Sequence, residues 1–206
     1  MQINRLIQSL FETNCYIVSC DTTKEAIIID PGSDGEAILK FVADNNLNIK
    51  HILLTHGHFD HCTSLGKIVE KIDAPISIHS DDLPLMLESK KQAFLYGIKI
   101  SDPPSPTNFI EQDDTFEFGS NKLKAIHTPG HSPGGCCFLI DKTLFSGDTL
   151  FSNSIGRTDL PGGNSRQILS SIKNNLYILD DDTTVYPGHG ESTTIREEKR
   201  FNPYTQ

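Results

Sequence analysis

Short β-favouring apolar runs alternate with stripes of apolar residues at helical spacing through the first part of this chain. The runs at residues 3–7, 15–18, 26–29, 51–54 and 75–79 predict strands. Apolar residues recur every three or four positions up to Asn45, and again over residues 63–72, which predicts two helices. Ser33 and Glu36 have capping-box spacing, which places the start of the first helix there. Strands alternating with helices indicate an α/β domain.

The second part of the chain is richer in strands. Turns separate predicted antiparallel strands at residues 116–118, 123–127, 136–140 and 143–145, and a last strand is expected at residues 183–186. Helices are expected at residues 81–90, 165–176 and 193–200. Residues 101–106 hold three prolines and predict a surface loop or lid. No repeat or linker divides the sequence, so we expect one domain over residues 1–206.

Composition and charge narrow the class of protein. A chain of 206 residues can bury a sizeable core. Its formal net charge of -9 disfavours binding to nucleic acid, which needs a basic surface. No apolar run could span a membrane, and the N-terminus lacks a secretory pattern. Five cysteines without a Cys-x-x-Cys pattern predict reduced, mostly buried thiols. We therefore expect a cytoplasmic protein with neither nucleic acid nor membrane as a partner.

The densest chemistry follows the predicted strand that ends near residue 54, in the sequence Thr-His-Gly-His-Phe-Asp-His. Imidazole is the commonest metal ligand in proteins, and a carboxylate suits a hard divalent ion. Gly57 should allow a tight turn, so that several side chains converge on one point. A polar loop with incidental histidines is the alternative, but further candidate ligands recur downstream. The candidate ligands in this segment are His56, His58, Asp60 and His61.

Three further candidates each follow a glycine at the end of a predicted strand. They are His131 after Gly130, Asp148 after Gly147 and His189 after Gly188. The glycines should let the backbone bend so that each ligand points at a shared centre. Seven ligands are too many for one tetrahedral zinc ion, but they fit two ions that share one ligand. The residues not expected to be ligands are His51, His79, His127 and Cys62.

The ordered pattern His-x-His-x-Asp-His, Gly-His, Gly-Asp, Gly-His resembles the metallo-β-lactamase-fold hydrolases over essentially the whole chain. The segments Ile-Gly-Arg-Thr-Asp at residues 155–159 and Arg-Phe-Asn-Pro at residues 200–203 resemble the glyoxalase II (hydroxyacylglutathione hydrolase) branch. The chain would be a short form, without the C-terminal helical domain of typical glyoxalase II. The resemblance implies an α/β fold, the four-layer αββα sandwich, with the site at one edge of the two sheets.

The resemblance also divides the seven ligands between two divalent metal ions, with zinc as the first expectation and iron or manganese as alternatives. Asp148 would bridge the two ions. Asp30, at the end of an early strand, would support a ligand from behind. The other six form two sets, His56, His58 and His131 for one ion, and Asp60, His61 and His189 for the other.

Imidazole and carboxylate ligands on loops favour a catalytic metal site over a structural one. Two cations about 3.5–4 Å apart would bind a shared water, and the resulting hydroxide would attack a carbonyl carbon. Asp60 would orient this hydroxide or take its proton, so Asp60 and Asp148 are both expected to be catalytic. The implied activity is that of a thioesterase whose small-molecule substrate is S-lactoylglutathione or a related glutathione conjugate.

Other functions remain open on the sequence. A glutathione persulfide dioxygenase shares the motif and the Gly-Arg-Thr-Asp segment, but uses a single iron. A lactonase, a β-lactamase, or a non-catalytic binding protein on the same fold are further alternatives. Arg157 matches a basic residue that binds the glycine carboxylate of glutathione in glyoxalase II, so it is the expected substrate-binding residue. Alternatively, Arg157 pairs with Asp159 and only shapes its loop.

Overall fold

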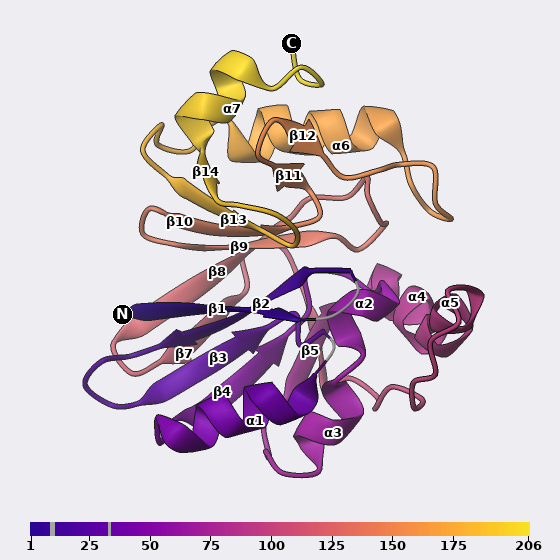
Figure 1. Ribbon diagram of the computed structural model, residues 1–206. Coiled ribbons are helices and arrows are strands. Elements are labelled where there is room, and N and C mark those ends of the chain that lie inside the picture. The colour runs from indigo at the N-terminus through magenta and orange to yellow at the C-terminus, as the bar shows by residue number, and fades with distance from the viewer. Residues whose placement is uncertain (9–10, 33) are drawn as a thin grey trace.

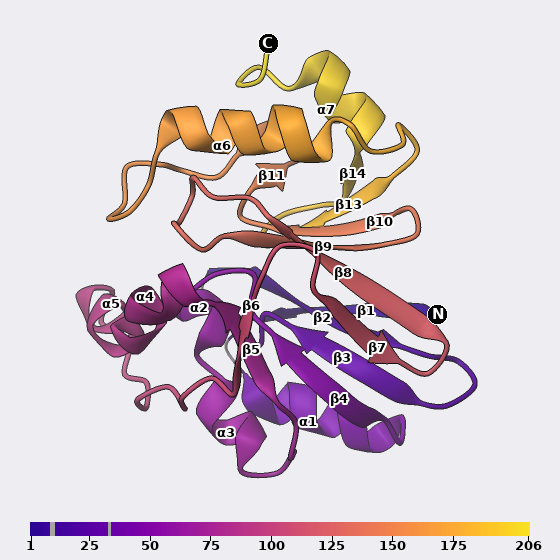
Figure 2. The same ribbon diagram turned by 180° about the vertical axis from the view of Figure 1, so that it is seen from behind.

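Two six-stranded sheets lie face to face and carry helices on their outer surfaces in the computed structural model of this chain (Figure 1). The structure describes residues 1–8, 11–32 and 34–206. Helices α1 and α3 cover the outer face of one sheet, and α6 and α7 cover the outer face of the other, as the view from behind shows most clearly (Figure 2). The predicted fold class, an αββα sandwich, is confirmed.

The first sheet is built from the first half of the chain, in the order β1-β2-β3-β4-β5-β6. Its antiparallel part is β1 (Gln2–Gln8), β2 (Thr13–Ser19) and β3 (Glu25–Ile29). Its parallel part continues with β4 (Asn48–Leu53), β5 (Ile76–His79) and β6 (Asn108–Ile110). The covering helices are α1 (Gly35–Asp44) and α3 (Leu65–Val69), and α2 (Phe59–Cys62) lies before α3.

The second sheet has the order β14-β13-β10-β9-β8-β7 and comes from the second half of the chain. Its strands are β7 (Thr115–Phe118), β8 (Asn121–His127), β9 (Cys136–Ile140), β10 (Thr143–Gly147), β13 (Thr184–Pro187) and β14 (Thr193–Thr194). The covering helices are α6 (Ser165–Ser171), which continues as the π-helical turn η2 (Ile172–Leu176), and α7 (Ile195–Phe201). A small hairpin joins β11 (Leu150–Phe151) and β12 (Ser154–Ile155).

The central strands are almost continuously apolar because both of their faces are buried. Successive side chains of a strand point to opposite faces, so Ile17 and Ile28 pack in the core beneath α1 and α3. Val18 and Ile27 pack instead in the core between the two sheets. A third core joins the second sheet to α6 and α7. A shift by one residue would turn these side chains to the wrong face, so the packing fixes the strand register. The register in turn fixes where each strand ends and where its ligand-bearing loop begins.

The region predicted to be helical over residues 81–90 is helical, but it is divided into three pieces. These are the 3-10 turn η1 (Ser80–Asp82), α4 (Leu83–Leu87) and α5 (Ser89–Leu95). Pro84 stands in the first turn of α4, where its missing N–H costs no helical hydrogen bond, so it marks a helix start rather than a helix interior. The strands β6 and β14 were not predicted, and β14 takes residues expected to begin the last helix.

Three further expectations concern the cap of the first helix, the cysteines and the absence of a membrane-spanning helix. Asp34 caps α1 through a hydrogen bond from the backbone N–H of Ala37, whereas Ser33 lies outside the described residues. All five cysteines are free and buried, as predicted. Cys62 lies on α2 with its thiol against the His58 and Phe59 carbonyls. Within the described ranges, none of the helices has the length and apolar character needed to cross a membrane.

Candidate metal centre

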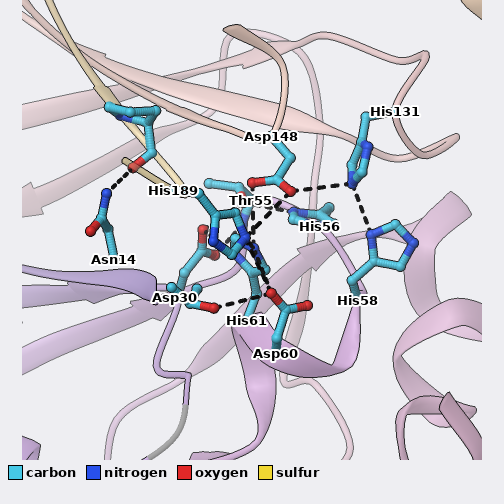
Figure 3. Close-up of polar contacts among 12 residues, drawn as sticks. Asn14, Asp30, Thr55, His56, His58, Asp60, His61, His131, Asp148 and His189 are labelled. Carbon is cyan, nitrogen blue, oxygen red and sulfur yellow. Dashed lines mark hydrogen bonds and ion pairs between the residues drawn. The ribbon is translucent and has the colours of Figure 1, made fainter. Parts of the chain in front are cut away.

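The seven predicted ligands converge at one end of the interface between the sheets (Figure 3). They come from four segments, each of which follows a strand. The segment after β4 carries four of them, two on its loop and two in α2, while the loops after β8, β10 and β13 carry one each. Because β10 and β13 are parallel neighbours, their carboxyl ends lie side by side, and the ligands that follow them meet.

Three histidines, His56, His58 and His131, form the first set. Their donor atoms lie within 4.8 Å of one another, and all three side chains are buried. His58 Nδ1 faces His131 Nε2 at 2.9 Å. The other ring nitrogen of His131, Nδ1, is hydrogen-bonded to the Arg157 carbonyl oxygen at 2.8 Å. That bond fixes the imidazole orientation and leaves Nε2 pointing at the centre.

Asp60, His61 and His189 form the second set, again with donor atoms within 4.8 Å of one another. Asp60 Oδ2 lies 3.2 Å from His189 Nε2 and 3.5 Å from His61 Nε2. The Thr13 hydroxyl donates to Asp60 Oδ2 at 3.0 Å. His189 Nδ1 is hydrogen-bonded to the Phe11 carbonyl oxygen at 2.9 Å, so its Nε2 is turned inward. Each ligand is thus held from outside by a separate protein group.

The Asp148 carboxylate lies between the two sets. Its Oδ2 is 3.5 Å from His131 Nε2 in the first set and 3.7 Å from His189 Nε2 in the second. Its Oδ1 is 3.4 Å from His61 Nε2. This carboxylate therefore faces both sets of ligands, which is the position that a shared ligand needs (Figure 3).

Asp30 orients histidines of both sets through one carboxylate. It accepts hydrogen bonds from Thr55 N at 2.7 Å and from Thr55 Oγ1 at 2.6 Å, and it lies 3.0 Å from His61 Nδ1. Thr55 Oγ1 is in turn 3.0 Å from His56 Nδ1. The structure therefore places Asp30 behind His61, and behind His56 by way of Thr55. Thr55 was not among the predicted site residues, although it directly precedes the ligand motif.

The donor atoms fit divalent metal ions. His56 Nε2 and Asp148 Oδ1 are buried and have no hydrogen-bond partner within residues 1–8, 11–32 and 34–206. Buried polar atoms normally have a hydrogen-bond partner or bind an ion. Two buried polar atoms that face one centre without a partner therefore indicate that a metal ion binds between them. Imidazole nitrogens and carboxylate oxygens are the ligands that zinc, iron and manganese accept.

Electrostatics at the centre favour a bound positive charge. Burial disfavours the imidazolium of His61, but Asp60, Asp148 and Asp30 outweigh it and raise the pKa of His61 to about 10. Burial would also raise the pKa of Asp60, but His61 and His189 hold it well below the usual value of a carboxyl group. Burial, together with His131, lowers the pKa of His58 to about 4. The three carboxylates thus attract a cation, while His58 keeps a free lone pair.

Two of the four glycines beside the ligands, Gly130 (φ 139°) and Gly147 (φ 49°), have a positive φ and use the backbone freedom of glycine, as expected. The other two serve close packing instead. Gly57 and Gly188 do not have the positive φ that only glycine adopts readily. A Cβ at Gly188 would lie 2.2 Å from Asp148 Oδ1 and 2.7 Å from a carbon of the His61 ring. The reason expected for Gly57, a tight turn that needs glycine, is therefore wrong. Gly57 is needed because a side chain there would collide with neighbouring groups.

The remaining histidines lie apart from the centre. His51 packs edge-on against Phe116. His79 and His127 stack with ring centroids 4.1 Å apart and planes only 6° from parallel, beside Asp81. Nitrogen lone pairs lie in the ring plane, so two parallel stacked rings cannot both direct a lone pair at one ion. This geometry makes the second His-Asp cluster unsuited to a metal.

Arg157 is exposed and paired with a neighbouring acid. Its Nε donates to Asp159 Oδ1 and its Nη2 to Asp159 Oδ2, each at 2.7 Å. The pairing that sequence analysis weighed against substrate binding is thus present in the structure. The Arg157 backbone contributes separately, because its carbonyl oxygen holds His131.

A cleft of about 550 Å³ opens beside Asp60. One wall holds two aromatic rings, with Phe11 edge-on to Phe59 at 5.1 Å between ring centroids. Two lysines, Lys67 and Lys99, line the same cleft. Space for a small molecule with apolar and anionic parts therefore adjoins the candidate ligands.

Comparisons with known proteins agree with this architecture. A family model described as the Metallo-beta-lactamase superfamily matches residues 9–189. The chain is 35% identical over 208 residues to hydroxyacylglutathione hydrolase GloC of Haemophilus influenzae, which covers 99% of this chain and 98% of that protein. It is 34% identical over 208 residues to the probable metallo-hydrolase YqgX of Bacillus subtilis, with 99% and 97% covered.

Three solved structures are also similar over nearly the whole chain. The BLEG-1 B3 metallo-beta-lactamase has a TM-score of 0.92 at 35% identity, with 100% of each chain covered. TTHA1623 in a di-iron-bound form has a TM-score of 0.90 at 36% identity, with 98% of this chain and 99% of that chain covered. ETHE1 from Myxococcus xanthus has a TM-score of 0.84 at 29% identity, with 98% and 84% covered.

Proposed function

Because the chain belongs to the metallo-β-lactamase superfamily, we propose that it is a dinuclear metal hydrolase that cleaves S-lactoylglutathione or a related glutathione thioester. The observation that carries this proposal is the pair of three-ligand sets that share the Asp148 carboxylate. A single four-coordinate ion would leave several of these buried donors without a partner. The similarity to a protein named hydroxyacylglutathione hydrolase supports the choice of substrate.

The chain's own residues would divide the work of hydrolysis. When bound, two divalent ions supply Lewis acidity and lower the pKa of the water they share. Asp60 lies in the second set with its Oδ2 facing His61 and His189, so it can orient the attacking water and accept its proton. Asp30 and Thr55 hold His61 and His56 in place, which keeps the ligands preorganised.

The cleft beside Asp60 would receive the substrate. Phe11 and Phe59 offer an apolar wall for the acyl part, and Lys67 and Lys99 offer positive charge for a carboxylate of the thiol part. The hydrolysis products of such a thioester are a hydroxy acid and a free thiol. Localisation in the cytoplasm and a small-molecule partner belong to this proposal.

A glutathione persulfide dioxygenase is the second candidate, and the likeness to the ETHE1 structure fits it. That enzyme would need one iron, whereas the hydrolase needs two ions. Metal-loaded protein should contain two ions per chain by elemental analysis, and it should hydrolyse glutathione thioesters faster than lactones or β-lactams. One iron per chain together with oxygen consumption on glutathione persulfide would replace the hydrolase by the dioxygenase.

The Arg157 side chain provides a test of how a glutathione conjugate is held. If its guanidinium binds the glycine carboxylate, Arg157→Ala should lower kcat/KM for S-lactoylglutathione roughly ten- to hundredfold, which corresponds to about 1.5–3 kcal/mol. The loss should appear mainly in KM, because the carboxylate lies far from the reacting carbonyl. Steady-state kinetics with this substrate measure the effect, and the backbone carbonyl that holds His131 is kept.

Asp159→Asn is the matched variant, since it weakens the present pairing and frees the guanidinium. Under the same hypothesis it should lower KM for S-lactoylglutathione. A small thioester without a carboxylate should respond little to either change. If Arg157→Ala lowers kcat/KM equally for both substrates, Arg157 shapes its loop and does not bind the substrate carboxylate.

A further inference from the structure

Asp82, the last residue of η1, carries a fully buried carboxylate. In the part of the chain that the structure describes, no hydrogen bond or ion pair joins this carboxylate to the side chain of a candidate ligand. Instead it accepts two backbone hydrogen bonds. The N–H of Gly57 donates to its Oδ2 at 2.8 Å, and the N–H of Gly134 donates to its Oδ1 at 2.6 Å. Hydrogen bonds from N–H groups to an ionised carboxylate are short and about twice as strong as neutral ones.

The two donors belong to the two loops that bear the first ligand set. Gly57 stands between His56 and His58, and Gly134 stands in the tight loop that follows His131. These loops come from different sheets, since the first follows β4 and the second follows β8. One carboxylate, placed on a third segment, therefore bridges the two sheets beside three histidines.

Close packing shows that η1 fits between these loops with little room to spare. A Cβ at Gly57 would lie 2.6 Å from the Asp82 carbonyl oxygen, and a Cβ at Gly134 would lie 2.7 Å from the Asp82 backbone nitrogen. Real Cβ atoms essentially never approach backbone so closely. Both loops thus lack a side chain at the point where Asp82 passes, which lets the carboxylate reach both N–H groups.

We propose that Asp82 is a positioning residue that fixes the spacing of the His56–His58 loop and the His131 loop, and thereby sets the affinity of the three-histidine site for its ion. This rests on the proposed function only in that the three histidines bind a metal. The second set has two supports of its own, Thr13 and the Phe11 carbonyl, and shares Asp30 with the first set. We therefore expect Asp82 to act mainly on the ion of the three-histidine site.

Glu198 offers a matched control, because it is an equally buried carboxylate on α7 with similar bonding. It accepts from Asn153 N at 3.0 Å, Thr193 Oγ1 at 2.6 Å and Asn202 Nδ2 at 2.8 Å. Asp82→Asn and Glu198→Gln each replace one buried acid by its isosteric amide. Both variants lose hydrogen bonds and should lower the melting temperature of the metal-free protein.

Metal binding separates the two variants. Titration of the metal-free proteins with cobalt(II) or zinc, in competition with a chromophoric chelator, should show one ion bound about 10- to 100-fold more weakly in Asp82→Asn. The second ion should bind as in the wild type, and Glu198→Gln should bind both ions normally. The visible spectrum of bound cobalt(II) should change only in Asp82→Asn. Asp82→Glu keeps the charge but displaces it by one methylene, so it should weaken the same ion by a smaller factor. This variant also tests the proposal if Asp82→Asn does not fold.

The outcomes distinguish this inference from the proposed function. Wild-type affinity and an unchanged cobalt spectrum in both Asp82 variants would overturn the positioning role and leave the hydrolase proposal intact. A wild-type protein that binds no ion would overturn both.

Discussion

Replacing Asp148 by alanine should lower kcat of the proposed thioesterase reaction by roughly 10³-fold. Its carboxylate lies within 3.7 Å of histidine nitrogens in both ligand sets, so its removal takes one ligand from each ion. Loss of a single preorganised electrostatic group in an active site costs about 10²–10³ in kcat. Asp148 would serve two ions, and two cations facing each other with less negative charge between them repel more strongly.

Metal content and turnover should be measured together on Asp148→Ala, beside a variant of a surface acid. Asp182→Ala removes an exposed partner of Arg196 and should leave both quantities unchanged, since such surface pairs contribute little. Near-normal hydrolysis by Asp148→Ala, with two ions still bound, would remove Asp148 from the site.

The strands and most ligand positions could be predicted because their signals are local. Ile27, Ile28 and Ile29 form a run that is apolar throughout, and only a strand buried on both faces needs such a run. The ligands follow such strands, and their order along the chain resembles a known family. Residue patterns over a few positions therefore carried the fold class and the set of residues that meet at the centre.

The supports of the ligands could not be predicted, because they depend on contacts between distant segments. Asp82 is 25 residues from Gly57 and 52 from Gly134, and nothing near it in the sequence marks a buried carboxylate. Its segment was correctly predicted to be helical, but the sequence did not show that the helix is divided after η1. Thr55 is adjacent to the motif, but its link from His56 to Asp30 appears only once β3 and β4 are paired.

The short edge strands and the pairing of Arg157 with Asp159 also could not be predicted from the sequence. β14 has two residues and β6 has three, too few to show an alternating pattern. The sequence placed Arg157 and Asp159 two positions apart, which allows pairing but does not require it. The structure shows both contacts between the two side chains, and kinetics with matched substrates decide what the pairing means for binding.

In the metal-free protein, the contribution of His61 to the free energy of unfolding, measured as the difference between wild type and His61→Gln, should fall steadily between pH 6.5 and pH 8.5. The difference removes the opposite trend of Cys20, because hydrogen bonds with neighbouring hydroxyl groups lower the pKa of that thiol to about 5. Against the effect of burial, Asp60, Asp148 and Asp30 raise the pKa of His61 to about 10, whereas an unfolded histidine titrates near pH 6.5. The folded chain thus keeps a proton that the unfolded chain loses. This stabilisation is complete below about pH 6.5 and is lost as the pH rises towards 10, with a slope of about 1.4 kcal/mol per pH unit for one proton.

Other titrating groups define the useful window. Burial, with His131, lowers the pKa of His58 to about 4, so His58 affects stability only below about pH 6.5. Unfolded thiols ionise near pH 8.5, whereas burial raises the pKa of Cys62 to about 12 and that of Cys137 to about 11. These thiols steepen the loss above pH 8.5. Against burial, the hydrogen bond to Asp60 raises the pKa of His189, which adds to the trend inside the window.

Bound metal should remove this pH dependence, because an imidazole that binds a metal is neutral and has no proton to retain. Urea denaturation at pH 6.5, 7.5 and 8.5, with a chelator or with saturating zinc, measures the two slopes. Metal-free His61→Gln should lose the contribution of His61, since glutamine does not titrate, and should keep only the slopes of the other groups, His189 among them. If His61→Gln keeps the wild-type slope, the carboxylates do not hold their proton at His61, and the attraction of this centre for a cation is weaker than its geometry implies.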